Sequence, residues 1–288
     1  MILLIKILKE EFADILMIKI GIISGGGDLP LSIGINLIKK KYPVCFFPIK
    51  NFTNLSTYNN FEFLEIELNS FNKIINSLKK MKINKIIMAG NILRPSINDI
   101  KFDIHSLSLI KKFILEPKGD DKLLRTISNF FSEKGFSLFN WKNECEDLFT
   151  DKANLTNYKP SKFAIKNRDK GINIFKIIGN ADIGQSLVIQ NQLVLGVEAA
   201  EGTDELLKRC FYYKKTGDKG VLIKFSKYIQ HAELDLPTIG LNTFINIKKN
   251  KYEGVFVEKN KCVIINKDKI IEYCNNNNLF LSSFEKLE

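Results

Sequence analysis

The sequence predicts an α/β protein made of an N-terminal Rossmann-like parallel-sheet domain and a C-terminal mixed α/β domain, joined by a short linker. In the first half, short apolar runs of strand length alternate with helical patterns, which is typical of βαβ units. The second half adds a hairpin pattern to its helices, which indicates a mixed sheet. At 288 residues the chain is long enough for two hydrophobic cores.

The domain boundary is expected after Phe149, where a polar, proline-containing segment lacks apolar periodicity. We place the N-terminal domain at residues 17–150, the linker at 151–160 and the C-terminal domain at 161–288. Residues 1–16 are expected to be a dispensable extension. Lysines and acids interrupt their apolar run, which is too short and too charged for a signal peptide or a membrane-spanning helix.

The net charge of +11 is spread over lysines along the whole chain. Such a surface suits a phosphorylated ligand or an anionic membrane face, whereas no nucleic-acid-binding motif is present. The five cysteines contain no CxxC pair, which favours a reducing cytoplasm. With only two histidines, a bound metal is expected to be a hard cation held by carboxylates. The residues leave open whether the chain forms a homodimer.

The first domain opens with a βαβ unit whose first turn, Ser24 to Gly27, is rich in glycine and is the usual cradle for a phosphate group. Pro30 stands where the dinucleotide fingerprint requires a third glycine, and the second strand ends without an acid. A nicotinamide cofactor is therefore disfavoured, while a nucleotide diphosphate is not. The elements expected here are strands over 18–23, 44–49, 61–66, 85–89 and 136–139, helices over 30–41 and 71–81, a helix capped by 119–121, and a short helix over 141–149.

In the second domain, an apolar run from Leu193 opens onto acids at the start of a helix, at Glu201 and Asp204. This arrangement can present oxygen ligands from a rigid base, although a simple N-capped helix is the alternative. A second acid, Asp235, precedes a rigid Leu-Pro-Thr-Ile-Gly turn. The other elements expected are a helix over 168–179, a hairpin of 186–190 with 192–198, a strand over 221–225, a helix over 241–250, a second hairpin within 254–265, and a helix from 267 that leads into an Asn-rich tail.

Six segments together resemble the UDP-2,3-diacylglucosamine pyrophosphatases of the LpxI type: 22–30, 88–95, 119–125, 182–185, 197–204 and 235–240. The resemblance runs in order from about Met17 to the C-terminus. It implies Mg²⁺-dependent cleavage of UDP-2,3-diacylglucosamine to UMP and 2,3-diacylglucosamine 1-phosphate in lipid A biosynthesis. It further implies a cytoplasmic enzyme peripherally associated with the inner membrane, with Asp235 as an essential acid.

The chain departs from this family just before Asp235, where the usual aspartate and arginine are replaced by His231 and Glu233. If that arginine contacts the diphosphate, another cation such as Lys224 or Lys227 must replace it, or this protein binds its substrate more weakly.

Diphosphate hydrolysis requires neutralised phosphate oxygens and an oriented water, which Mg²⁺ and a carboxylate base supply. Asp235, Glu201 and Asp204 are the predicted catalytic and metal-binding residues, and Asp182 is a weaker candidate. A non-catalytic protein that binds a nucleotide or nucleotide sugar remains the alternative. The residues predicted to bind substrate are Gly26, Gly27, Asp28, Leu29, Gly90, Asn91, Arg94, Asp120, Asp121, Arg125, Gln185, Glu198, Ala199, Ala200, Gly202, Thr203, Lys224 and Thr238.

Overall fold

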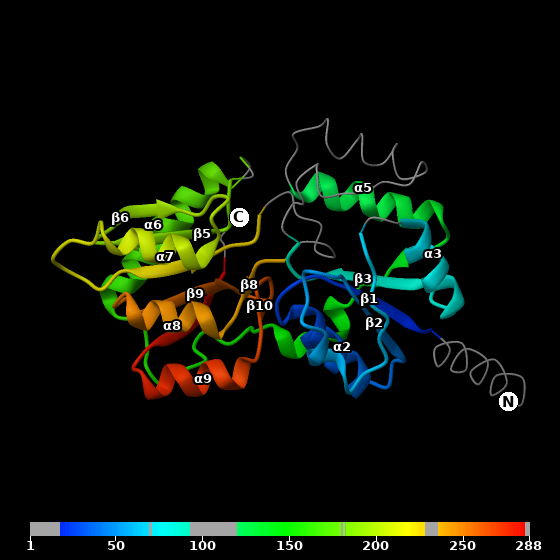
Figure 1. Ribbon diagram of the computed structural model, residues 1–288. Coiled ribbons are helices and arrows are strands. Elements are labelled where there is room, and N and C mark those ends of the chain that lie inside the picture. The colour runs from blue at the N-terminus through cyan, green and yellow to red at the C-terminus, as the bar shows by residue number, and fades with distance from the viewer. Residues whose placement is uncertain are drawn as a thin grey trace, which may run out of the picture. The chain divides into compact units, whose positions relative to one another are not determined.

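The computed structural model describes residues 18–68, 71–92, 120–179, 181, 183–227 and 236–285, and this description leaves out the side chains of residues 120–124. The chain divides into two compact units, Met1–Cys145 and Glu146–Glu288 (Figure 1). Both units combine helices with a sheet, so the predicted α/β class is confirmed. No described helix combines the length and the apolarity that crossing a bilayer requires.

Unit 1 holds a parallel sheet, as predicted, whose four strands follow the order β2-β1-β3-β4. Its strands are buried apolar runs, which suits a parallel sheet covered on both faces. The strands are β1 (Ile20–Ser24), β2 (Val44–Pro48), β3 (Lys85–Ala89) and β4 (Ser137–Leu138). The helices are α2 (Leu29–Lys39), η1 (Leu55–Tyr58), α3 (Phe71–Lys80), α5 (Asp120–Glu133) and η3 (Lys142–Glu144).

The prediction of a continuous strand over 61–66 is wrong. The segment runs beside β2 but forms only two isolated bridges, Phe63 with Phe46 and Ile66 with Ile49. Pro48 lies between these bridges, and because proline has no N–H it cannot donate the ladder hydrogen bond expected there. The helix predicted over 141–149 is also replaced, by two single 3₁₀ turns at η3 and η4 (Glu146–Leu148).

Unit 2 holds a five-stranded mixed sheet in the order β11-β9-β7-β5-β6 and a separate parallel pair, β8 with β10. One face of the larger sheet is covered by α6, and the other by α7, α8 and α9 (Figure 1). The strands are β5 (Ser186–Gln190), β6 (Leu193–Val197), β7 (Val221–Lys224), β8 (Thr238–Ile239), β9 (Gly254–Glu258), β10 (Val263–Ile264) and β11 (Phe280–Phe284). The helices are α6 (Lys162–Ile178), α7 (Thr203–Phe211), α8 (Leu241–Lys249) and α9 (Lys267–Asn276).

The predicted first hairpin of unit 2 is confirmed by the antiparallel β5–β6 pair, whereas the second hairpin is wrong. β9 lies between β7 and β11 and pairs with both in parallel, so neither of its edges is open to β10. β10 pairs with β8 instead. The tail, for which no strand was expected, forms the edge strand β11.

Two further boundaries differ from the sequence expectation. Helix α6 begins six residues before the predicted start, because the side chain of Ser161 caps it by accepting a hydrogen bond from the Ala164 N–H (3.1 Å). Residues 151–160, expected to be a linker, lie in part along β11: the Leu155 N–H donates to the Leu281 carbonyl (2.9 Å).

Candidate functional site

Several predicted site residues of unit 2 meet at one edge of its sheet. This is an edge at which strands begin or end, not an edge strand. β6, β7, β9 and β11 run in one direction and β5 in the other, so four carboxyl ends and the amino end of β5 share this edge. Carboxyl ends of parallel strands are where open α/β sheets hold ligands. Four polar side chains lie there, which we call the strand-end cluster: Ser186, Glu198, Thr203 and Lys224.

A chain of hydrogen bonds connects the strand-end cluster. The Lys224 ammonium donates to the Thr203 hydroxyl (2.6 Å) and to the Ser186 hydroxyl (3.3 Å). The Thr203 hydroxyl in turn donates to Glu198 Oε1 (2.7 Å). Lys224 Nζ lies 4.0 Å from Glu198 Oε2, and the two residues are only 5% and 9% exposed. The Lys224 ammonium and the Thr203 hydroxyl, both predicted to bind substrate, therefore make hydrogen bonds within the protein.

Glu198 is held as a carboxylate by this network. Burial by itself raises its pKa, but the charge of Lys224 and hydrogen bonds from Thr203, Ser186 and the Gln185 N–H more than offset burial, so the pKa lies below its ordinary value. The site thus contains a fixed, paired negative charge.

This pKa shift predicts a pH dependence of stability. Because the pKa of Glu198 is lower in the folded than in the unfolded state, its stabilisation is complete above the ordinary pKa of 4.5 and is lost as the pH falls through the lower, folded value. We expect the free energy of unfolding in urea to fall less steeply below about pH 4.5 in Glu198→Gln than in the parent protein. Glu205→Gln, at an exposed ion pair, is the matched control. Equal slopes for parent and Glu198→Gln would contradict the assignment.

Close backbone packing positions Glu198. A Cβ on Gly184 would lie 2.0 Å from the Glu198 carbonyl oxygen, so only glycine allows the two segments to approach this closely. The next residue, Gln185, donates its N–H to Glu198 Oε2 (3.3 Å). The segment before β5 and the segment after β6 are thereby locked together.

The two predicted acids after β6 have different environments. Glu201 Oε1 accepts from Arg209 Nε (2.9 Å) and Nη2 (2.7 Å), and Oε2 accepts from the Ala199 N–H (3.1 Å). Asp204, in the first turn of α7, accepts only from the Thr243 hydroxyl (3.0 Å, at Oδ1) among the described residues. Asp204 is therefore the more available metal ligand of the two.

Other predicted residues of unit 2 lie in the turn before α7 and in β8. Ala200 and Gly202 lie in the turn between β6 and α7, where Gly202 is the N-cap. Thr238 starts β8, and its hydroxyl donates to the Leu236 carbonyl (3.0 Å). Predicted residues outside the described part of the chain are Arg94, Asp182, His231, Glu233 and Asp235.

In unit 1 the glycine turn meets the end of β3. The Gly26 N–H donates to the Asn91 carbonyl and the Asn91 N–H to the Gly26 carbonyl, both at 2.8 Å. A Cβ on Gly90 would lie 2.7 Å from the Gly25 carbonyl carbon, so this contact requires glycine. The Gly25 and Gly26 N–H groups already donate within the protein, so they are not available to a phosphate. A phosphate bound at this turn would instead contact N–H groups at the start of α2.

The other residues predicted in unit 1 lie on α5 or at the start of α2. Gly27 and Asp28 are exposed, and Asp28 is the N-cap of α2, which Leu29 begins. Asp120 and Asp121 begin α5, and Arg125 is exposed on that helix.

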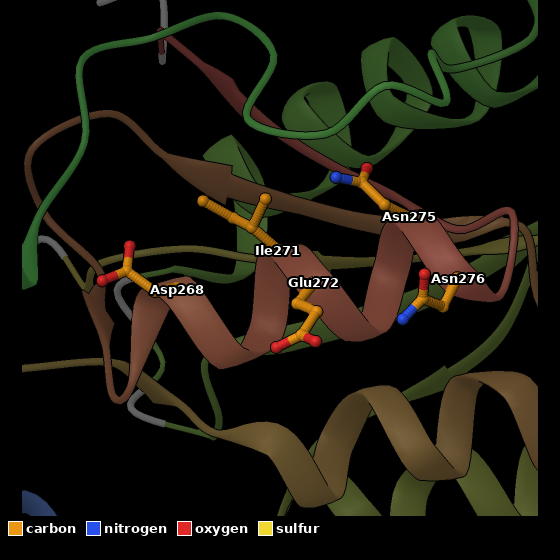
Figure 2. Close-up of a pocket in the computed structure, with 5 residues that line it drawn as sticks. All are labelled: Asp268, Ile271, Glu272, Asn275 and Asn276. Carbon is orange, nitrogen blue, oxygen red and sulfur yellow. The ribbon is translucent and has the colours of Figure 1, made fainter.

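A surface hollow lies on α9 (Figure 2). Its lining residues are Asp268, Ile271, Glu272, Asn275 and Asn276. Ligand sites usually gather polar groups from several elements, and this hollow draws on one helix. We assign it no function.

The donors among the described residues are compatible with Mg²⁺. Among the described residues, no three His, Cys, Asp or Glu side chains gather into a metal site. Mg²⁺ needs only one or two carboxylates, with waters and phosphate oxygens completing its octahedron. Asp204, with one carboxylate oxygen free of described partners, fits that requirement.

Sequence reasoning missed three residues that hold the site. Ser186 contacts Lys224. Arg209 binds Glu201, and Thr243 binds Asp204. Ser186 had a detectable signal, since it directly follows the predicted residue Gln185. Arg209 and Thr243 have no sequence signal, because their contacts depend on how α7 packs on β6 and α8.

Comparison with known proteins covers both units. The family model of the LpxI N-terminal domain matches residues 19–148, and that of the LpxI C-terminal domain matches residues 151–282. A relative from Caulobacter vibrioides, the UDP-2,3-diacylglucosamine pyrophosphatase LpxI, is 27% identical over 279 residues. That alignment covers 94% of this chain and 99% of the relative.

Proposed function

The chain belongs to the LpxI family, because models of both LpxI domains match it over most of its length, and we propose that its substrate is UDP-2,3-diacylglucosamine. As a member of this family it is an enzyme that hydrolyses a diphosphate bond. The products are UMP and 2,3-diacylglucosamine 1-phosphate, and the reaction belongs to lipid A biosynthesis. The observation that carries the proposal is the match of both domains in order along one chain.

The roles of the acids follow from their partners. Asp204 would hold Mg²⁺, since Glu201 is bound to Arg209 and Glu198 to Thr203 and Lys224, and Asp235 would be its second carboxylate ligand. Bound Mg²⁺ neutralises the diphosphate oxygens and stabilises the leaving phosphate. The strand-end cluster keeps the start of α7 fixed against the sheet, which sets the position of Asp204.

The glycine turn of unit 1 supplies the nucleotide contacts in this proposal. N–H groups at the start of α2 suit phosphate oxygens, because a helix start carries unsatisfied donors and a partial positive charge. The two acyl chains of the substrate place the enzyme at the cytoplasmic face of the inner membrane, as a peripheral protein.

A metal-removal assay tests the reaction. We expect the purified full-length protein to release UMP from UDP-2,3-diacylglucosamine with Mg²⁺, to lose at least about a hundredfold in rate with EDTA, and to recover when Mg²⁺ is restored. Tight binding of the nucleotide sugar without release of UMP would identify a non-catalytic binding protein instead. Running the reaction in ¹⁸O water and locating the label identifies the phosphorus that is attacked.

A further inference from the structure

The outer side of α6 exposes large apolar residues among lysines. Phe163 is 62% exposed and Ile177 is 81% exposed, near opposite ends of the helix. Lys166 and Lys170, also exposed, lie between them. Successive spacings of three, four and seven residues put all four side chains on one side of a helix. We call these four residues the α6 stripe.

The charge of α6 is strongly positive and uncompensated. The helix carries four lysines and Arg168 against a single acid, Asp169. Asp169 is already bound by Arg168, whose Nη2 lies 2.7 Å from Oδ1. None of the four lysines has an ion-pair partner among the described residues, so they present free positive charge to the surroundings.

The α6 stripe leads toward the edge of the sheet that holds the strand-end cluster. α6 spans about 25 Å and ends shortly before β5, which starts at that edge. Between them lies Ile183, which is 51% exposed and directly precedes Gly184, the residue packed against Glu198. Exposed apolar side chains therefore stand both near the end of α6 and just before β5.

We propose that the α6 stripe is the surface with which this protein lies on an anionic lipid membrane. Phe163 and Ile177 enter the boundary between headgroups and acyl chains, while Lys166 and Lys170 contact lipid phosphates. A protein partner fits less well, because lysine is depleted at protein interfaces and its charge is costly to bury there. The inference rests on the proposed function, in which the substrate carries two acyl chains.

A second aromatic surface serves as a control. Tyr212 and Tyr213 are 83% and 59% exposed at the end of α7, which covers the opposite face of the sheet. The neighbouring Lys214 ammonium is used within the protein, since it donates to the Asn250 (3.2 Å) and Lys251 (2.7 Å) carbonyls. This surface resembles the α6 stripe in apolar exposure, but the lysine next to its two tyrosines is bound within the protein.

Vesicle co-sedimentation of the full-length protein, without substrate, tests the surface. We expect binding to phosphatidylcholine vesicles that contain phosphatidylglycerol, weaker binding at high salt, and little binding to phosphatidylcholine alone. Phe163→Ser with Ile177→Ser, and separately Lys166→Gln with Lys170→Gln, should each weaken binding at least about tenfold. Tyr212→Ser with Tyr213→Ser should change it less than about twofold.

Two results would overturn the inference: no binding of the parent protein to the anionic vesicles, or undiminished binding of both α6 double variants. All four substituted α6 side chains are exposed, so we expect melting temperatures close to that of the parent. Turnover of substrate dispersed in detergent separates this inference from the proposed function. Vesicle binding without turnover would refute only the function, and turnover without vesicle binding only the surface.

Discussion

We expect Asp235→Asn to lower turnover of UDP-2,3-diacylglucosamine by at least about a hundredfold while leaving substrate binding and the melting temperature close to those of the parent. Asparagine keeps the size and most hydrogen bonds of aspartate but removes its charge, so metal binding and base catalysis are lost and folding is not. Steady-state kinetics, thermal unfolding and substrate binding by calorimetry measure the three quantities.

The matched control for Asp235→Asn is Asp169→Asn, which removes a half-exposed acid paired with Arg168 on α6. In a detergent-dispersed assay this variant should keep its turnover within about twofold, because an exposed ion pair contributes little. If Asp235→Asn retained more than about a tenth of the parent rate, Asp235 would not be catalytic. Asp204 would then be the better candidate, since Glu201 is bound to Arg209.

The second large effect is expected from Lys224→Met, which should lower the free energy of unfolding by about 3–5 kcal/mol at neutral pH. Removing the ammonium leaves the Glu198 carboxylate buried without its cation and takes a hydrogen-bond donor from Thr203 and Ser186. Urea unfolding followed by circular dichroism measures the change. We also expect the pKa of Glu198 to rise, since the favourable charge is gone.

Two variants test whether the lower free energy of unfolding of Lys224→Met comes from breaking the buried pair of Lys224 and Glu198. Lys208→Met removes a lysine from an exposed pair with Glu205 and should cost no more than about 0.5 kcal/mol. The double variant Lys224→Met with Glu198→Gln removes both charges and should be more stable than the sum of the single effects predicts. Additive effects would show that the Lys224 and Glu198 side chains do not stabilise each other. That result would contradict the central role given to this pair in the strand-end cluster.

Much of the fold was predictable from local patterns. The βαβ start, β3, the β5–β6 hairpin and α9 have clear apolar runs bounded by glycine, proline or asparagine, and these signals depend only on neighbours in sequence. The motif after β6 was also visible, because a strand that ends in acids at a helix start has a distinctive order of residues. The sequence thereby predicted two α/β units, and it named the acids after β6 and the glycine turn after β1 as candidate site residues.

Strand partners and side-chain partners were decided by the tertiary structure. β9 and β10 follow one another in sequence as a hairpin would, but β7 and β11 already take both edges of β9. The pairing of Lys224 with Glu198 depends on the strand order β7-β5-β6, and that of Glu201 with Arg209 depends on how α7 packs against the sheet. Apolar periodicity records which face of an element is buried, but not which element covers it, so only the folded chain determines which of the acids is free to bind a metal.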